Sequence, residues 1–208
     1  YFVGTGSFHI EPPSTMNTVI IQDTVYQSFH NVNYEIGGAI YVNNSLFQIR
    51  LTSVGFSDCT TENECGGYYL NGYQIQLANI CGYKCEAIGY DYQFFKVECN
   101  DLHDLNLFSM VTVVECGMNN RGNSAFGVNG PSRYQITNVN STYNINHFNS
   151  KSFGACFRTF DVKGYKVSYF DFAHSTGLDI VNTHFYGLPA QEFNGVFEFG
   201  NFYNCSID

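Results

Sequence analysis

The stretch that decides the fold is Gly37–Val42, which reads GGAIYV and joins a glycine pair to a short apolar run. Variants of this stretch recur along the chain at nearly constant spacing. Their first residues are Gly37, Gly66, Phe94, Ser124, Gly154 and Asn182, so successive copies start 29, 28, 30, 30 and 28 residues apart. A period of about 29 residues is typical of solenoid proteins, in which each repeat forms one coil of a stack.

Alternating apolar runs lie between these copies. Leu46–Cys59 reads LFQIRLTSVGFSDC, and Gly72–Cys85 (GYQIQLANICGYKC) and Leu107–Cys116 (LFSMVTVVEC) follow the same plan. Alternation of apolar and polar residues predicts strands with one face inward, and turns rich in Asn and Gly separate them. Each coil is therefore expected to contain at least two short strands.

The repeat predicts an all-β fold with little or no helix: a right-handed parallel β-helix of about seven coils of roughly 29 residues. Residues 1–208 are expected to form a single domain, in which residues 1–13 are an extended leading segment. The predicted interior column consists of Ile40, Val42, Ile49, Leu51, Ile75, Leu77, Val111 and Val113. An antiparallel β-sandwich is the alternative fold, but its hairpins do not require a 29-residue period.

The composition limits the partners. Only 13% of the 208 residues are charged, and the formal net charge is −9. Without a cluster of Lys or Arg, the chain lacks the means to displace counterions from a nucleic-acid backbone. No apolar run approaches the roughly 18 residues that span a bilayer. We therefore expect neither nucleic-acid binding nor membrane insertion.

Eight cysteines indicate an oxidising compartment, so the chain is expected to be extracellular, either secreted or at a cell surface. Their spacing includes no Cys-x-x-Cys pair, and we expect neither a metal site nor a cofactor. Three sequons place candidate glycosylation sites at Asn43, Asn140 and Asn204, although the chain's 23 Asn residues would produce about this number by chance.

The cysteine positions provide a test of the stack. Cys59 lies 12 residues after Phe47 and Cys85 lies 12 after Tyr73, so the two thiols share a phase and are the first disulfide candidate. Cys81 and Cys116, each eight residues after an aromatic residue, are the second candidate pair. Alignment of the turn endings instead places Cys116 over Cys85. A ladder of buried thiols is the alternative to both disulfides.

The segments GGAI (Gly37–Ile40), FSDC (Phe56–Cys59) and FYNC (Phe202–Cys205) resemble the repeats of polymorphic outer membrane proteins and their secreted eukaryotic relatives. This resemblance implies a right-handed parallel β-helix in an extracellular or cell-surface region that serves adhesion or builds a surface structure. It provides no catalytic residues. Asp208 follows FYNC without a capping segment, from which we expect further chain or another subunit to stack there, end to end.

Many parallel β-helices act on polysaccharides, so an enzyme is the main alternative to a structural or adhesive protein. Asp161, Asp171 and Glu198 are the candidate catalytic carboxylates, because adjacent coils would bring Asp171 and Glu198 to nearly the same phase. The motifs of a pectinase-like site are absent, and scattered surface charge also explains these residues. We therefore do not expect an enzyme.

A glycan-binding module without turnover is the third hypothesis. It rests on a dense group of aromatic residues that would suit sugar stacking, protein contact or core filling. The group consists of Tyr68, Tyr69, Tyr73, Tyr90, Tyr92, Phe94 and Phe95. The expected partners are therefore further copies of the chain or other surface proteins, together with glycans.

Overall fold

The fold is described from a computed structural model. The structure describes the backbone of residues 2–3, 8–9, 17–31, 36–89, 92–99, 105–116, 124–129, 133–142, 154–158, 169–181, 184–185, 193–203 and 206–207. Side chains are described for residues 17–31, 36–89, 92–99, 106–116 and 126–128. Every regular element among these residues is a β-strand and every strand pairing is parallel, so the all-β prediction is confirmed and the antiparallel sandwich is wrong. None of the described residues forms a helix of the length and hydropathy that crossing a membrane requires.

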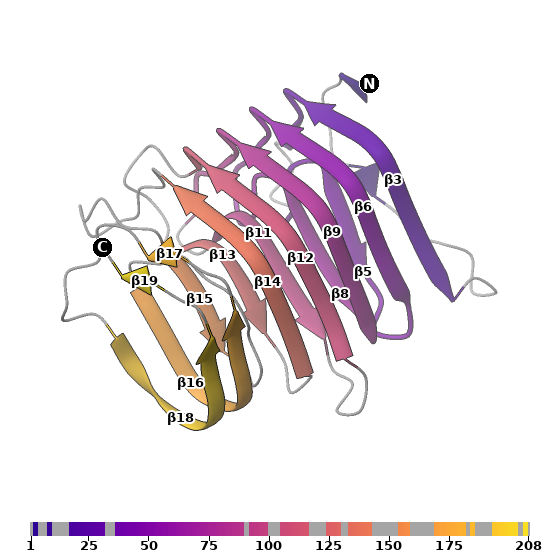
Figure 1. Ribbon diagram of the computed structural model, residues 1–208. Coiled ribbons are helices and arrows are strands. Elements are labelled where there is room, and N and C mark those ends of the chain that lie inside the picture. The colour runs from indigo at the N-terminus through magenta and orange to yellow at the C-terminus, as the bar shows by residue number, and fades with distance from the viewer. Residues whose placement is uncertain are drawn as a thin grey trace.

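Long strands form one side of the molecule, called here the long-strand side. They are β3 (Thr18–Gln27), β6 (Gln48–Ser57), β9 (Gln74–Tyr83), β12 (Leu105–Val114) and β14 (Arg133–Thr142). In Figure 1 these strands lie side by side in front, with their arrowheads pointing the same way. Each pairs with the next in this order, although a whole coil of chain separates them.

Shorter strands lie behind them in Figure 1 and form the short-strand side. They are β5 (Ile40–Asn43), β8 (Tyr68–Gly72), β11 (Tyr92–Cys99), β13 (Ser124–Asn129) and β15 (Gly154–Arg158). A third set of two-residue strands, β4 (His30–Asn31), β7 (Thr60–Thr61) and β10 (Glu86–Ala87), forms a small sheet of its own. The chain therefore winds as a β-solenoid, with about 3 turns in the part that is described most completely.

The leading segment contributes strands to the first coil. β1 (Phe2–Val3) pairs with Tyr26 and Gln27 of β3, and β2 (Phe8–His9) pairs with Ile40 and Tyr41 of β5. The remainder of residues 1–13 lies outside the described residues.

The register shows which residues stack. On the short-strand side Ile40 pairs with Tyr68, and Tyr68 pairs with Phe95. The predicted alignment of Gly37 over Gly66 placed Ile40 over Tyr69 and is therefore wrong by one residue. The same offset is present at the glycines, because the amides of Gly37 and Gly38 hydrogen-bond the carbonyls of Glu64 and Cys65.

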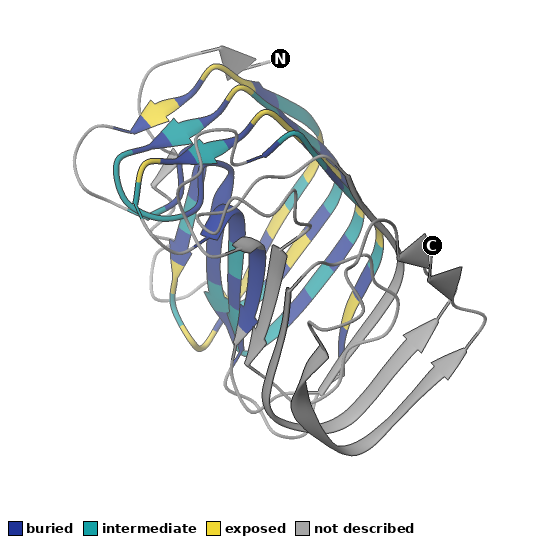
Figure 2. Ribbon diagram, turned by 90° about the vertical axis from the view of Figure 1, so that its left-hand side faces the viewer, coloured by how far each residue is buried: buried dark blue, intermediate teal, exposed yellow. Residues whose placement is uncertain are grey.

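The interior is largely apolar and rich in aromatic residues. All eight predicted core residues are buried, none with more than 2% of its surface exposed. Beside them the rings of Tyr68, Phe95 and Phe126 stack from coil to coil, each 4.8 Å from the next between ring centroids. Figure 2 shows the resulting alternation of buried and more exposed residues along the strands. Of the aromatic group predicted to reach the surface in part, Tyr73 is half-buried, Tyr90 lies outside the described residues and the other five are buried. Three of these five, Tyr68, Phe94 and Phe95, fill the main core.

Four of the long strands, β3, β6, β9 and β12, each bend at one residue near the middle. Asp23, Ser53, Asn79 and Met110 have φ between 50° and 55°, in the left-handed region. A second left-handed residue follows each strand, at Ser28, Asp58, Lys84 and Glu115. Because these positions are in register, the four coils turn the same two corners.

The regular period ends after β15. β16 (Tyr169–Val181) pairs with β15 through Tyr169–Phe172 and with β14 through Ile180 and Val181, so it crosses from one side to the other. The prediction that Asn182 begins the copy after Gly154 is therefore wrong, because Gly154 pairs with Tyr169. β18 (Phe193–Tyr203) pairs with β16, and β17 (His184–Phe185) pairs with β19 (Ser206–Ile207). The count of seven coils and the right-handed sense stay predictions.

Candidate functional site

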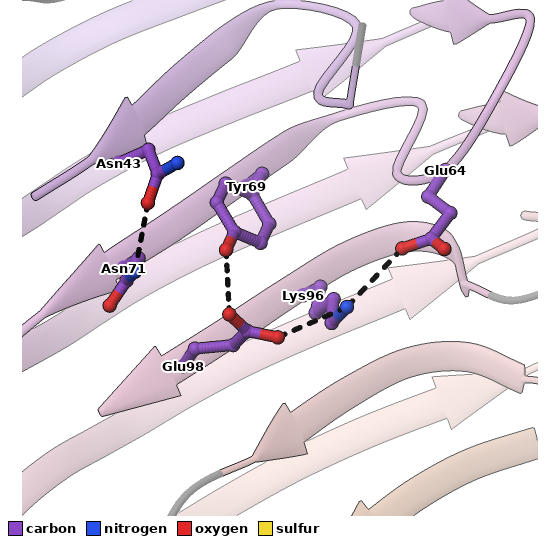
Figure 3. Close-up of polar contacts among 6 residues, drawn as sticks. All are labelled: Asn43, Glu64, Tyr69, Asn71, Lys96 and Glu98. Atoms are coloured by element: carbon purple, nitrogen blue, oxygen red, sulfur yellow. Dashed lines mark hydrogen bonds and ion pairs between the residues drawn. The ribbon is translucent and has the colours of Figure 1, made fainter. Parts of the chain in front are cut away.

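Polar side chains gather on the outer face of β5, β8 and β11. Register places Tyr41, Tyr69 and Lys96 in one row across these strands. Asn43, Asn71 and Glu98 form the parallel row two residues further along. Glu64, from the loop before β8, completes the group. These seven residues are called the outer cluster, and Figure 3 shows six of them.

A charged network lies at the centre of the outer cluster. The hydroxyl of Tyr69 donates a hydrogen bond of 2.6 Å to Oε2 of Glu98. The ammonium of Lys96 lies 3.1 Å from Glu98 Oε1 and 3.4 Å from Glu64 Oε2, as Figure 3 shows. Only 16% of the Lys96 side chain is exposed, which is less than in a typical surface ion pair. The ammonium also lies over the rings of Tyr69 and Tyr92, 5.8 Å and 5.3 Å from their centroids.

The pKa values of Tyr69 and Lys96 are both raised in the charged network. Burial raises the pKa of Tyr69, and the hydrogen bond that its neutral hydroxyl donates to Glu98 raises it further. Burial alone would lower the pKa of Lys96, but Glu64 and Glu98 outweigh it and the pKa is raised. A general acid or base works best with a pKa near the working pH, and both shifts lead away from neutrality. Tyr69 and Lys96 are therefore a fixed donor and a fixed cation.

The tyrosine rings of the outer cluster cover each other. Tyr41 and Tyr69 stack with their centroids 5.4 Å apart and their planes inclined by 20°. Sugar recognition by aromatic side chains uses the flat face of a ring. Between these two rings the facing surfaces are already in contact, which weakens the hypothesis of a sugar-stacking platform.

The amide row continues the same ladder. Nδ2 of Asn71 donates to Oδ1 of Asn43 at 2.8 Å, and Nδ2 of Asn43 donates to the hydroxyl of Tyr41 at 3.0 Å. Asn43 is exposed, so its sequon is accessible, and its glycosylation stays a prediction. Asn140 pairs with Thr112 in the register of β14, and Asn204 lies outside the described residues.

The long-strand side has ladders of its own. Gln48 Nε2 donates to Gln74 Oε1 at 3.1 Å, and Arg50 Nε donates to Gln76 Oε1 at 3.0 Å. Both contacts join residues 26 positions apart. Polar side chains on this side therefore also bond to the equivalent position of the next coil.

The register separates the predicted carboxylates. Asp171 lies in β16 opposite Asn194 of β18, and Glu198 follows four residues later in β18. Asp161 lies outside the described residues. Among the side chains that the structure describes, no group of three or more His, Cys, Asp or Glu is arranged to hold a metal ion.

The two predicted cysteine pairs have different outcomes in the structure. Cys59 and Cys85 do lie in neighbouring coils, but as thiols, and a disulfide between them stays a prediction. The proposed contact of Cys81 with Cys116 is wrong, because Cys81 is exposed and pairs with Thr112. That prediction placed Phe108 over Tyr73, whereas the strands align Phe108 with Leu77. The alternative alignment, with Cys116 beside Cys85, is the one that the structure has.

The sequence reasoning missed the charged network, although one signal for it was present. Tyr69 and Glu98 are 29 residues apart, and Glu64 and Lys96 are 32 apart, so each pair is separated by about one coil. A search for complementary side chains at the repeat period would have found both pairs.

Comparisons with protein-family models, with curated proteins and with solved structures found no match to this chain.

Proposed function

We propose that the protein is a structural β-solenoid of about seven right-handed coils that works outside the cell or on its surface and stacks with further copies of itself. Its eight cysteines, its low charge and the resemblance of GGAI and FSDC to surface-protein repeats support this setting. Its function is to present and extend a surface, without turnover of a substrate.

The observation that carries this proposal is which residues the outer polar side chains contact. Most of their contacts join residues 26 to 32 positions apart, as in Gln48 with Gln74 and Lys96 with Glu64. Such contacts link each coil to the next along the axis. A catalytic site instead brings unlike groups to one point and leaves them open to substrate. Ladders of this kind stiffen a rod and leave few polar groups for chemistry.

Stacking of copies is supported by the first long strand. On one edge β3 pairs with β6 along its whole length, from Thr18 to Gln27. On the other edge the described strand is β1, which pairs only with Tyr26 and Gln27. Among the residues that the structure describes, Thr18–Val25 thus have no strand partner on this edge. A strand edge without a strand partner can accept another strand. Ile20 in this segment is 57% exposed.

Sedimentation velocity and negative-stain microscopy of the purified chain, over a wide range of protein concentration, test the proposal. We expect rods that lengthen with concentration. Ile20→Lys should shorten them, because it places a charge beside the stacking edge. Leu46→Lys is the matched control, since Leu46 is 73% exposed in the turn before β6, one coil further from that edge.

Two results would overturn the proposal. One is a wild-type chain that remains a single particle at every concentration. The other is release of sugar from a polysaccharide that Asp171→Asn or Glu198→Gln abolishes, which would instead establish the carbohydrate-active alternative.

A further inference from the structure

Three cysteines occupy the same place in successive coils. Cys59, Cys85 and Cys116 each lie two residues beyond the end of a long strand, after β6, β9 and β12. The residue before each is left-handed, with φ of 53°, 51° and 52°. Each thiol contacts the carbonyl two residues earlier in the chain, at 3.4, 3.6 and 3.5 Å. The three turns therefore have one local geometry.

These turns stack directly on one another. Ser57 pairs with Tyr83, and Tyr83 pairs with Val114, so the residues that anchor the turns are in register. Neighbouring parallel strands lie about 4.8 Å apart. This spacing falls within the Cα separation of about 4.4 to 6.8 Å that a disulfide requires.

The three thiol side chains are buried and lie at equivalent positions of adjacent coils. The thiol of Cys59 hydrogen-bonds to Cys85, and Cys85 hydrogen-bonds to Cys116. All three side chains are 0% exposed. We call Cys59, Cys85 and Cys116 the thiol ladder. Cys85 is its middle member and the one that touches both of the others.

Burial also protects the ladder once the protein has folded. The hydrogen bond to Cys85 raises the pKa of Cys59, and burial raises it further; burial raises the pKa of Cys85. The thiolate is the form that attacks a disulfide. The ladder is therefore inert in the closed coil, and any oxidation occurs as the coils form or open.

We propose that Cys85 is the shared member of two mutually exclusive disulfides, Cys59–Cys85 and Cys85–Cys116, which form by exchange with a small-molecule disulfide during folding. In each molecule one pair is bridged and the third cysteine keeps its thiol. The arrangement would pin two adjacent coils together at a turn.

The exchange is balanced in atoms and electrons. One cysteine thiolate attacks the small disulfide, forms a mixed disulfide and expels one small thiolate. The neighbouring cysteine thiolate then attacks the cysteine sulfur of the mixed disulfide and expels the second small thiolate. The small disulfide gains two electrons, and the two cysteines lose them.

Cys81 is placed differently from the thiol ladder. Cys81 pairs in register with Gly55 and Thr112, so no thiol stands beside it in either adjacent coil. Cys99 pairs with Gly72. Because Cys81 is exposed, it serves as a control that reacts in the folded state.

The test uses the full chain, refolded in a buffer of reduced and oxidised glutathione. Remaining thiols are alkylated after unfolding, and peptide mapping by mass spectrometry identifies the linked cysteines. We expect Cys59–Cys85 and Cys85–Cys116 peptides in the wild type, and none that joins Cys59 to Cys116. Cys59→Ala should leave only the Cys85–Cys116 link, and Cys116→Ala only the Cys59–Cys85 link.

Two control variants complete the design. Cys85→Ala should abolish every link within the ladder, whereas Cys81→Ala should give the wild-type pattern. Circular dichroism establishes which variants fold; if Cys85→Ala does not, Cys59→Ala and Cys116→Ala decide the question. Full alkylation of all three ladder thiols in the refolded wild type would overturn the proposal, as would a Cys59–Cys116 link in Cys85→Ala.

Discussion

The short-strand side and the long-strand side close the same coil by different means. On the short-strand side, residue identity is decisive, because Gly37 adopts a φ of +87° and Gly66 packs directly against backbone. On the long-strand side, residues as different as Ser53 and Met110 adopt the same left-handed conformation. The backbone of the short-strand side therefore depends on which residue is present. The backbone of the long-strand side instead repeats the same corner in each coil, whatever the residue.

The corners also change which residues face inward. In β6, Ile49 and Leu51 are buried before the corner, and Val54 and Phe56 are buried after it. The alternation thus shifts by one residue at Ser53. β9 shows the same shift around Asn79. A single left-handed residue therefore lets one continuous strand line two walls of the interior.

Replacement of Gly66 by Ala should produce the largest effect. An added Cβ would lie within 3.0 Å of backbone atoms of Glu86 and Cys59, which have little freedom to move. We expect the free energy of unfolding to fall by about 3 kcal/mol or more, measured by chemical denaturation.

The matched control is Gly55→Ala on the long-strand side. There an added Cβ would meet Cγ2 of Val25 at 3.4 Å, an ordinary contact. Its effect should stay within about 0.5 kcal/mol. Equal losses for the two variants would remove the distinction between the two sides.

Replacement of Tyr69 by Phe tests the charged network of the short-strand side. It removes the hydroxyl that donates to Glu98, a hydrogen bond to a charged group in a half-buried setting. Stability should fall by about 2 kcal/mol at neutral pH.

The raised pKa values of Tyr69 and Lys96 predict how the stability of the protein changes with pH. A group whose pKa is raised on folding stabilises the protein below its unfolded pKa, here about 10. That stability is lost as the pH rises through the folded pKa. Stability measured at alkaline pH should therefore fall less steeply for Tyr69→Phe than for the wild type. Parallel curves would show that the network does not titrate with folding.

The sequence predicted the parts of the fold that depend on residue type. Ile49 and Leu51 were placed in the core by alternation, because a buried β-strand position selects for apolar side chains. The position of Cys85 over Cys59 followed from equal spacing. The glycine pair identified the coil period, because the backbones approach there too closely for a side chain.

The corners were missed because their residues do not identify them. Turn rules search for Gly, Asn and Asp, which tolerate positive φ most readily. Lys84, Met110 and Glu115 share the conformation of the residues at the equivalent positions in the coil before them. The outer cluster was missed for a related reason: Glu64 and Lys96 are ordinary charged residues until the stack brings them together.

Replacement of Tyr68 by Phe should have the opposite sign to the Tyr69 variant next to it. The hydroxyl of Tyr68 is buried and has no hydrogen-bond partner among the described residues. Its removal should raise the free energy of unfolding by about 1 kcal/mol, because a desolvated group without a partner is lost. A clear loss of stability in chemical denaturation would mean that the hydroxyl has a partner, such as a buried water molecule.

The smallest expected effect lies at a corner, where Asn79 and Met110 stack as neighbours. Left-handed backbone strains Met more than Asn, whose short polar side chain tolerates it. Met110→Asn should therefore stabilise the protein by up to about 1 kcal/mol, and Asn79→Met should destabilise it by a similar amount. Both side chains point to solvent, Met110 being 50% exposed, so core packing contributes little. Met110→Leu retains the strain and should change nothing. Chemical denaturation of the two single variants, and of the double variant that combines them, would measure the strain directly. If the double variant has wild-type stability, the stack imposes the conformation of each corner. The energetic cost of the conformation then depends only on the residue placed there.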